Sequence, residues 1–291
     1  MSTPIIEFRN VSKWYGEGEQ RTEVLSNINL TIEEGEFLAI VGFTGSGKTT
    51  LVNLMTGLIA PSEGEVLYRG EPITGPAPER GIIFQNYSLL PWFTVYQNVA
   101  LSVNEVYSDW PKAKRDEHIR RFIEMVNLTP ATDKRPKELS GGMKQRTSIA
   151  RVLATDPDLL LMDEPLGALD ALTRGNLQEE ILKIWSANRR TAVLITNDVD
   201  EGILMADRII PLTPGPRAEL GPEYRIDIAR PRDKTKLNTD LNFKRVRTEI
   251  LNYLVELGEA AKLNAGEDIA LPDLEPIQPG TRSFVSFRRA S

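Results

Sequence analysis

The sequence predicts an α/β fold in which a doubly wound core with a parallel sheet is interrupted by a helical subdomain and carries an antiparallel β portion near the N-terminus. Three observations support this prediction. The apolar runs Phe37–Val41 and Leu159–Met162 have the length of buried parallel strands. The first run leads through a glycine-rich segment into a helical pattern. Alternating apolar and polar residues at Glu7–Val11 and Leu25–Ile32 are typical of half-buried strands.

Composition limits the class of protein. The chain has 291 residues, of which 41% are hydrophobic, so it can bury a substantial core. It has no cysteine and its first residues lack the layout of a signal peptide, which favours a reducing, cytoplasmic setting. The apolar runs are far shorter than the roughly 20 residues that span a bilayer. The net charge of -6 opposes nucleic-acid binding, so no nucleic-acid partner is expected.

The first chemical motif follows the strand predicted at Phe37–Val41. It is Gly-Phe-Thr-Gly-Ser-Gly-Lys-Thr, and apolar residues at helical spacing come after it. Glycines allow successive backbone N–H groups to curl round a phosphate, and the helix N-terminus adds a favourable dipole. The pattern predicts a phosphate loop in which Lys48 reaches the outer phosphates and the Thr49 hydroxyl binds Mg²⁺. A chance glycine-rich turn is the alternative. The predicted binding residues are Gly42, Phe43, Thr44, Gly45, Ser46, Gly47, Lys48, Thr49 and Thr50.

The second motif is the pair Asp163-Glu164 at the end of an apolar strand. An aspartate at the carboxyl end of a parallel strand is placed to hold Mg²⁺, and a neighbouring glutamate is placed to orient or deprotonate water. An ordinary strand end with a polar turn is the alternative. After a phosphate loop, the pair favours phosphoryl transfer to water.

The third motif is Leu139-Ser-Gly-Gly-Met-Lys-Gln-Arg146. Ser140 precedes a predicted helix and has the properties of an N-cap. Ser140, Gly141 and Gly142 therefore form a second helix end that favours an anion.

Together these motifs resemble the ATP-binding subunits of ABC transporters, whose signature is Leu-Ser-Gly-Gly-Gln; Met143 replaces the glutamine here. The resemblance covers nearly the whole chain. It implies a P-loop NTPase core at residues 1–86 and 156–234, an inserted helical subdomain at 87–155, and ATP and Mg²⁺ as cofactors.

The same resemblance implies further roles. Tyr15 matches the aromatic that stacks on adenine, although Trp14 beside it and ordinary packing remain alternatives. Gln85 matches the glutamine that contacts Mg²⁺ and the attacking water, unless it is a loop or capping amide. Asp170 matches the aspartate of a loop that crosses between two subunits. Asn197 occupies the position of a histidine that contacts the γ-phosphate.

The resemblance also implies partners. The apolar segment Asn86–Val95 corresponds to the region that receives the membrane subunit, so we expect transmembrane permease subunits and a peripheral position at the cytoplasmic face of the inner membrane. A second ATPase subunit is expected in a head-to-tail dimer. Phe84–Trp92 and Ala229–Asp233 resemble the nitrate, bicarbonate, taurine and sulfonate importers, with nitrate favoured. Such importers imply a periplasmic or lipid-anchored anion-binding protein.

Helical spacing predicts two more helices. One covers residues 109–126, with the only histidine, His118, on its solvated face. The other covers residues 235–264, with Phe243, Val246 and Ile250 on its apolar face. An irregular tail is expected at 265–291.

Two alternative functions remain open. A non-transport ABC protein acting on DNA or ribosomes is disfavoured. The chain has no long coiled-coil heptad repeat, no second copy of the ATPase cassette and no excess of basic over acidic residues. A nucleotide-binding subunit with little turnover is kept open by Asn197, because an amide can carry neither a proton nor a positive charge.

Overall fold

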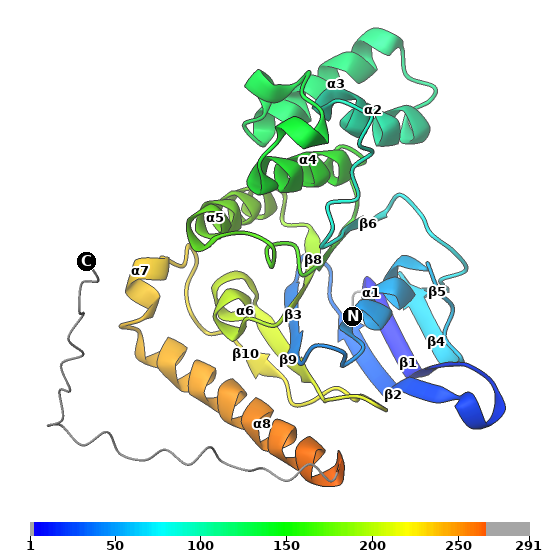
Figure 1. The fold of residues 1–291 in the computed structure, drawn as a ribbon, viewed down its shortest axis with the longest axis vertical. Helices are drawn as coiled ribbons and strands as arrows, with labels where there is room; N and C mark the ends of the chain where they lie inside the picture. The colour runs from blue at the N-terminus through cyan, green and yellow to red at the C-terminus, as the bar shows by residue number, and fades with distance from the viewer. Residues whose placement is uncertain (1–2, 266–291) are drawn as a thin grey trace, which may run out of the picture.

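The computed structural model describes residues 3–265 as two sheets surrounded by helices (Figure 1). The first sheet is antiparallel and has the strand order β2-β1-β4-β5. Its strands are β1 (Ile6–Tyr15), β2 (Thr22–Ile32), β4 (Glu63–Tyr68) and β5 (Glu71–Pro72). The antiparallel β portion predicted near the N-terminus is therefore confirmed.

The second sheet forms the core and has the order β10-β9-β3-β8-β7-β6. Its strands are parallel, except that the short β10 pairs antiparallel with β9. They are β3 (Phe37–Gly42), β6 (Arg80–Ile83), β7 (Leu159–Asp163), β8 (Thr191–Thr196), β9 (Arg208–Leu212) and β10 (Tyr224–Arg225). Every residue of β3, β7 and β8 is buried. This burial explains the continuous apolar runs, because helices cover both faces of a central parallel sheet.

Helices occupy three places around the core sheet (Figure 1). α1 (Lys48–Thr56) packs on β6, β7 and β2, which places it between the two sheets. α6 (Val199–Met205) packs on β3, β8 and β9. α5 (Ala171–Asn188) leads from the core toward a group of three helices at one end of the molecule: α2 (Val95–Val106), α3 (Lys112–Met125) and α4 (Gly141–Leu153).

These three helices lie within the segment that the sequence assigns to the helical subdomain, whose boundaries stay a prediction. His118 in α3 is not a solvated side chain. Its Nε2 lies 2.9 Å from the carbonyl oxygen of Ala154, and its ring packs edge-on against Trp110 and Phe122. The prediction of a solvated histidine is therefore wrong, because α4 and the aromatic residues cover this side of α3.

The predicted C-terminal helix is divided. α7 covers Lys234–Leu237 and α8 covers Leu241–Ala265. The break occurs because the Asp240 carboxylate accepts hydrogen bonds from the backbone N–H groups of Asn242 and Phe243 and so begins a new helix. The predicted tail lies outside the described residues, except for Ala265 at the end of α8.

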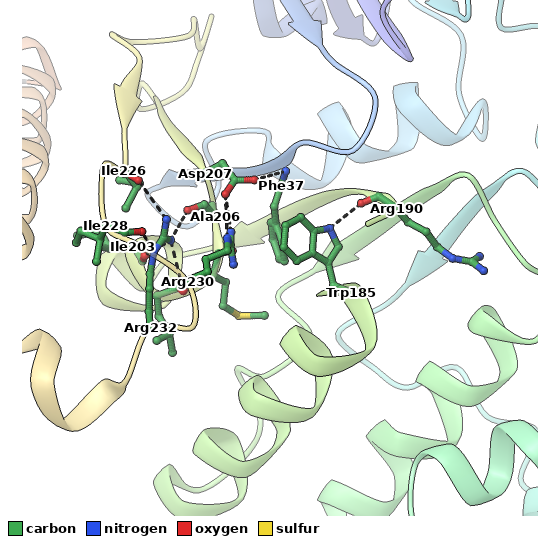
Figure 2. A network of polar contacts seen from close by, with 12 residues as sticks. Phe37, Trp185, Arg190, Ile203, Ala206, Asp207, Ile226, Ile228, Arg230 and Arg232 are labelled. Atoms are coloured by element: carbon green, nitrogen blue, oxygen red, sulfur yellow. Dashed lines mark hydrogen bonds and ion pairs between the residues drawn. The ribbon is translucent and has the colours of Figure 1, made fainter. Parts of the chain in front are cut away.

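Two arginines connect the segment between β10 and α7 to the core through hydrogen bonds and an ion pair (Figure 2). The Arg230 guanidinium pairs with Asp207 at 2.8 Å and lies 4.4 Å from the ring centre of Trp185. Burial lowers the pKa of Arg232 to about 10. The Arg232 guanidinium donates to the backbone carbonyls of Ile203, Leu204, Ala206, Ile226 and Ile228. This segment is therefore held by charge-assisted hydrogen bonds to the end of α6.

Candidate functional site

Three adjacent parallel strands bring the candidate site together. β8 pairs with β3 on one side and with β7 on the other. In this register Val41 lies beside Thr196, and Asp163 lies beside Ile195. The residues that follow these strands therefore meet at one edge of the sheet. The carboxyl ends of parallel strands are the usual place for ligands in such folds.

The phosphate loop runs from the end of β3 into α1. Gly45 and Gly47 have φ angles of +82° and +95°, which a side chain rarely adopts. A Cβ on Gly47 would also lie 2.9 Å from a methyl group of Val24. The Ser46 hydroxyl is buried and has no hydrogen-bond partner among the described residues. The backbone of the loop thus curls round the Ser46 hydroxyl, which lacks a hydrogen-bond partner among the described residues. Both features are expected of an anion site.

Lys48 is folded into this loop. Its Nζ donates to the carbonyl oxygens of Gly42 at 3.1 Å and Phe43 at 2.8 Å. Only 5% of the residue is exposed, and burial lowers the pKa of Lys48, although Glu164 and Asp163 oppose this shift. The buried ammonium therefore points into the loop, where a phosphate oxygen could replace the carbonyls as its partner.

Thr49 and Asp163, the two expected Mg²⁺ ligands, lie in contact, and their role in binding the metal stays a prediction. The Thr49 hydroxyl donates to Asp163 Oδ2 at 2.9 Å. Burial raises the pKa of Asp163, although the hydrogen bond from Thr49 opposes this shift. Such a pair of oxygen donors suits Mg²⁺, which prefers carboxylate and other oxygen ligands.

Glu164 lies at the centre of the remaining contacts. Its backbone is in the left-handed region, with φ of +46°, and its N–H donates to the Ile195 carbonyl at 2.9 Å. This conformation is strained for a residue with a side chain. Gln85 Nε2 donates to Glu164 Oε2 at 3.4 Å, and the Lys48 ammonium lies 3.8 Å from Glu164 Oε1.

Asn197 joins the two charged groups. Its Oδ1 accepts a hydrogen bond from Lys48 Nζ at 2.7 Å, and its Nδ2 donates to Glu164 Oε1 at 2.8 Å. The structure therefore brings together Lys48, Thr49, Gln85, Asp163, Glu164 and Asn197.

Ser140 and its two glycines are placed elsewhere. Ser140 is exposed and caps α4 by accepting from the Met143 N–H at 3.3 Å, as the sequence predicts. Within residues 3–265, no hydrogen bond links Ser140 to the phosphate loop. Gly142 is buried, and a Cβ there would lie 2.6 Å from a methyl group of Thr173. The signature segment thus belongs to the end of the molecule that carries α2, α3 and α4.

The aromatic candidates differ in exposure. Tyr15, at the end of β1, is 45% exposed, and Lys13 lies 5.1 Å from its ring centre. Trp14 is half-buried, and the Arg21 guanidinium covers its ring at 3.6 Å. The open ring is therefore that of Tyr15, and its role in stacking on adenine stays a prediction.

Sequence reasoning missed the polar residues behind the site. A cavity of about 400 Å³ opens beside Glu164 and Asn197. Polar residues of α5, α6 and α8 contribute to its lining: Arg174, Asp200, Glu201 and Arg247. The capping spacing of Asp198 and Glu201 at the start of α6 was the available signal.

Comparisons with known proteins identify the family. A family model described as ABC transporter matches residues 25–167. The bicarbonate transport ATP-binding protein CmpC of Synechococcus elongatus is 49% identical over 241 residues, which are 83% of this chain and 36% of that protein. The chain thus spans about a third of the length of this relative.

Other relatives are matched over different shares of their length and are named for bicarbonate or nitrate. The bicarbonate transport ATP-binding protein CmpD of a Synechocystis species is 44% identical, over 87% of this chain and 90% of that protein. The nitrate import ATP-binding protein NrtC of the same species is 45% identical, over 92% of this chain and 40% of that protein. Among solved structures, a dimeric post-hydrolysis state of the ATP-binding cassette MJ0796 with ADP and Pi has a TM-score of 0.69 and 31% identity, and covers 77% of this chain and all of that one.

Proposed function

The chain belongs to the ABC transporter family, and on this premise we propose that it is the ATP-binding and ATP-hydrolysing subunit of an importer of a small anion. The observation that supports this most directly is the meeting of Lys48, Glu164 and Asn197 at one sheet edge. Phosphoryl transfer needs mainly positioned charges and a positioned water. Lys48 would bind the outer phosphates, and Glu164 would act on the water.

Mg²⁺ is part of this proposal. Thr49 and Asp163 would bind the metal, and Gln85 would contact both the metal and the water. Bound Mg²⁺ would neutralise charge that develops on the phosphates. The contact between Thr49 and Asp163 already holds these two oxygen donors next to the phosphate loop.

A second ATPase subunit would complete each site. Ser140, Gly141 and Gly142 lie at the start of α4, away from the phosphate loop, and Leu172, two residues after Asp170, is 76% exposed. We infer a head-to-tail dimer in which the signature segment of each subunit closes the site of the other. The related cassette MJ0796 is dimeric in two solved structures.

Permease subunits would supply the path through the membrane. Among residues 3–265, no helix is long and apolar enough to cross a bilayer. Trp92, in the segment expected to receive the permease, is 62% exposed. An exposed indole of this kind is typical of protein interfaces. The proposal places the chain peripherally at the cytoplasmic face of the membrane, in a system that includes an anion-binding protein.

The cargo class comes from the relatives. Two of these relatives are a bicarbonate transport protein at 49% identity and a nitrate import protein at 45% identity. Nitrate is the anion that the sequence resemblance favours. Nitrate and bicarbonate are both small planar oxyanions, while sulfonates are tetrahedral at sulfur. We propose import of a small planar oxyanion. The ATPase does not contact this cargo, because the membrane and binding-protein subunits select it.

The direct test isolates the tagged full chain from detergent-solubilised membranes of its native host. We expect integral membrane subunits to co-purify and the assembly to hydrolyse ATP faster than the isolated chain. Trp92→Ser should weaken this co-purification, while Leu241→Ser, which changes an exposed apolar residue on α8, should not. If neither the natural chain nor the Trp92→Ser variant co-purifies with membrane subunits, the transport role is contradicted.

A second candidate function follows from Asn197. Its amide cannot carry the positive charge that a histidine can, so charge developing on the phosphoryl group would be less well stabilised. The site would then bind ATP and hydrolyse it slowly. In that case the chain would pair with a different, faster subunit, and single-turnover hydrolysis measured separately at the two sites would distinguish the two functions.

A further inference from the structure

Three buried polar side chains lie directly behind the strand end that carries Asn197. The Thr196 hydroxyl donates to Glu201 Oε2 at 2.6 Å, and Gln178 Nε2 donates to Glu201 Oε1 at 3.0 Å. The exposed fractions are 4% for Thr196, 6% for Glu201 and 2% for Gln178. Since these residues come from β8, α6 and α5, Glu201 connects three elements of the core.

The Glu201 carboxylate is not explained by stability. Burial raises the pKa of this group, which means that its charge is costly in the folded state. No ion pair among residues 3–265 involves Glu201. An apolar side chain of similar volume is often at least as stable as a buried charge. The presence of a buried carboxylate at position 201 therefore needs an explanation other than stability.

The explanation is the position of Glu201 beside the turn between β8 and α6, which contains Asn197. Thr196 immediately precedes Asn197, and its hydroxyl also accepts a hydrogen bond from the Asp198 N–H at 3.1 Å. The Asp198 carboxylate in turn accepts from the N–H groups of Asp200 and Glu201 and caps α6. The backbone is thus fixed on both sides of Asn197.

The helix that carries Glu201 is itself fixed. Arg232 donates to carbonyls at the end of α6, and Arg247 of α8 pairs with Asp200 near its start. Arg174 lies 3.8 Å from Asp198 and also donates to the Leu169 carbonyl. Glu201 therefore contacts the turn from a helix whose position is itself fixed by these contacts.

We propose that Glu201 is a positioning residue for ATP hydrolysis, which holds the Asn197 amide against Glu164 through the Thr196 hydroxyl. This inference rests on the proposed ATPase function. Glu201 does not contact the nucleotide, so its effect is on the rate of hydrolysis and not on binding. Small displacements of a positioned group are enough to reduce a rate substantially.

The first test compares two substitutions of the same size in the full chain. Glu201→Met removes both acceptor oxygens, and we expect single-turnover hydrolysis of Mg²⁺-ATP to fall about 10-fold or more. Affinity for a non-hydrolysable ATP analogue and the free energy of unfolding should not fall. Glu201→Gln keeps an acceptor for Gln178 and a polar partner for Thr196, so it should restore most of the rate. An unchanged rate in Glu201→Met, or a loss explained by lower stability or affinity, overturns the proposal.

The second test removes the hydroxyl instead. Thr196→Val should slow hydrolysis as Glu201→Met does, while Thr196→Ser should not. Thr191 is the matched control, because it is equally buried at the other end of β8 and its hydroxyl accepts from the Gly35 N–H at 3.0 Å. Thr191→Val should leave the hydrolysis rate unchanged.

A double-mutant cycle separates positioning from a general loss of structure. In an Asn197→Ala background there is no amide to position, so Thr196→Val should cause little further loss of rate. Equal losses in both backgrounds overturn the inference. If the unaltered chain hydrolyses no ATP, the proposed function itself fails, and this inference fails with it. If the unaltered chain hydrolyses ATP and only the Glu201 and Thr196 effects are missing, the ATPase function stands.

Discussion

Asn197 donates a hydrogen bond from Nδ2 to the Oε1 atom of Glu164 at 2.8 Å. The other end of the same amide accepts from Lys48. An amide can donate and accept at the same time without a change in charge. In this arrangement Asn197 holds Oε1 of the Glu164 carboxylate, while the second oxygen, Oε2, accepts from Gln85.

The carboxylate of Glu164 should be needed for chemistry and not for binding. Glu164→Gln keeps the size of the side chain but removes its basicity, so we expect ATP to bind while hydrolysis falls about 10²- to 10⁴-fold. Equilibrium binding and single-turnover hydrolysis measure the two effects separately. An unchanged hydrolysis rate would remove Glu164 from the catalytic role.

Lys48 should be needed for binding. Lys48→Ala removes the buried ammonium that points into the phosphate loop, and we expect nucleotide affinity or turnover to be abolished. Lys236→Ala is the control, since the Lys236 side chain is 85% exposed. Isothermal titration with Mg²⁺-ATP measures both. Equal affinities for the two variants would contradict the assignment of the loop.

The composite site predicts complementation between two inactive variants. A chain with Lys48→Ala and a chain with Ser140→Asp should each fail to hydrolyse ATP alone. In a mixed dimer, one site combines an intact phosphate loop with an intact signature segment, so mixing should restore hydrolysis. If the mixture stays inactive while a mixed dimer is detected by native mass spectrometry, the two segments do not share a site.

Asn197→His tests whether the amide limits the rate. If a missing charged donor weakens transition-state stabilisation, the histidine should raise single-turnover hydrolysis at this chain's own site about 10²-fold. Nucleotide affinity should change little. Should the rate at this site stay the same, the amide is sufficient and the low-turnover role loses its support.

The pKa of Glu201 predicts a dependence of stability on pH. Burial raises this pKa, so the contribution of the protonated group to stability is full below the unfolded pKa and is lost as pH rises through the folded pKa. Glu201→Gln removes this titration. The variant should therefore gain more stability over the natural chain at about pH 8 than at about pH 5. Urea unfolding at both pH values measures the difference, and equal differences would show that burial does not shift this pKa.

The sequence by itself determined the parts whose physics is local. A glycine loop between a strand and a helix, an N-cap at Ser140, and carboxylates after an apolar strand can each be read within about 10 residues, because backbone freedom and capping act over that range. The phosphate loop, the strands β3 and β7 and the antiparallel portion were predicted for this reason. The bound at residue 235 placed the C-terminal helix in one piece, whereas the Asp240 cap separates α7 from α8, because helix ends are less certain than helix existence in a periodic pattern.

The tertiary structure alone decided which of these parts meet. Lys48 and Asn197 are 149 residues apart in sequence, and their contact depends on β8 lying between β3 and β7. No local pattern encodes that order. The fold of the segment between α2 and α3 likewise placed His118 beside the rings of Tyr107 and Trp110. Glu201 was missed because a glutamate at a helix start is normally a solvated cap, so its spacing from Asp198 did not indicate burial. Only the packing of α6 on β8, together with the hydrogen bond from Gln178 of α5, buries Glu201 behind Asn197.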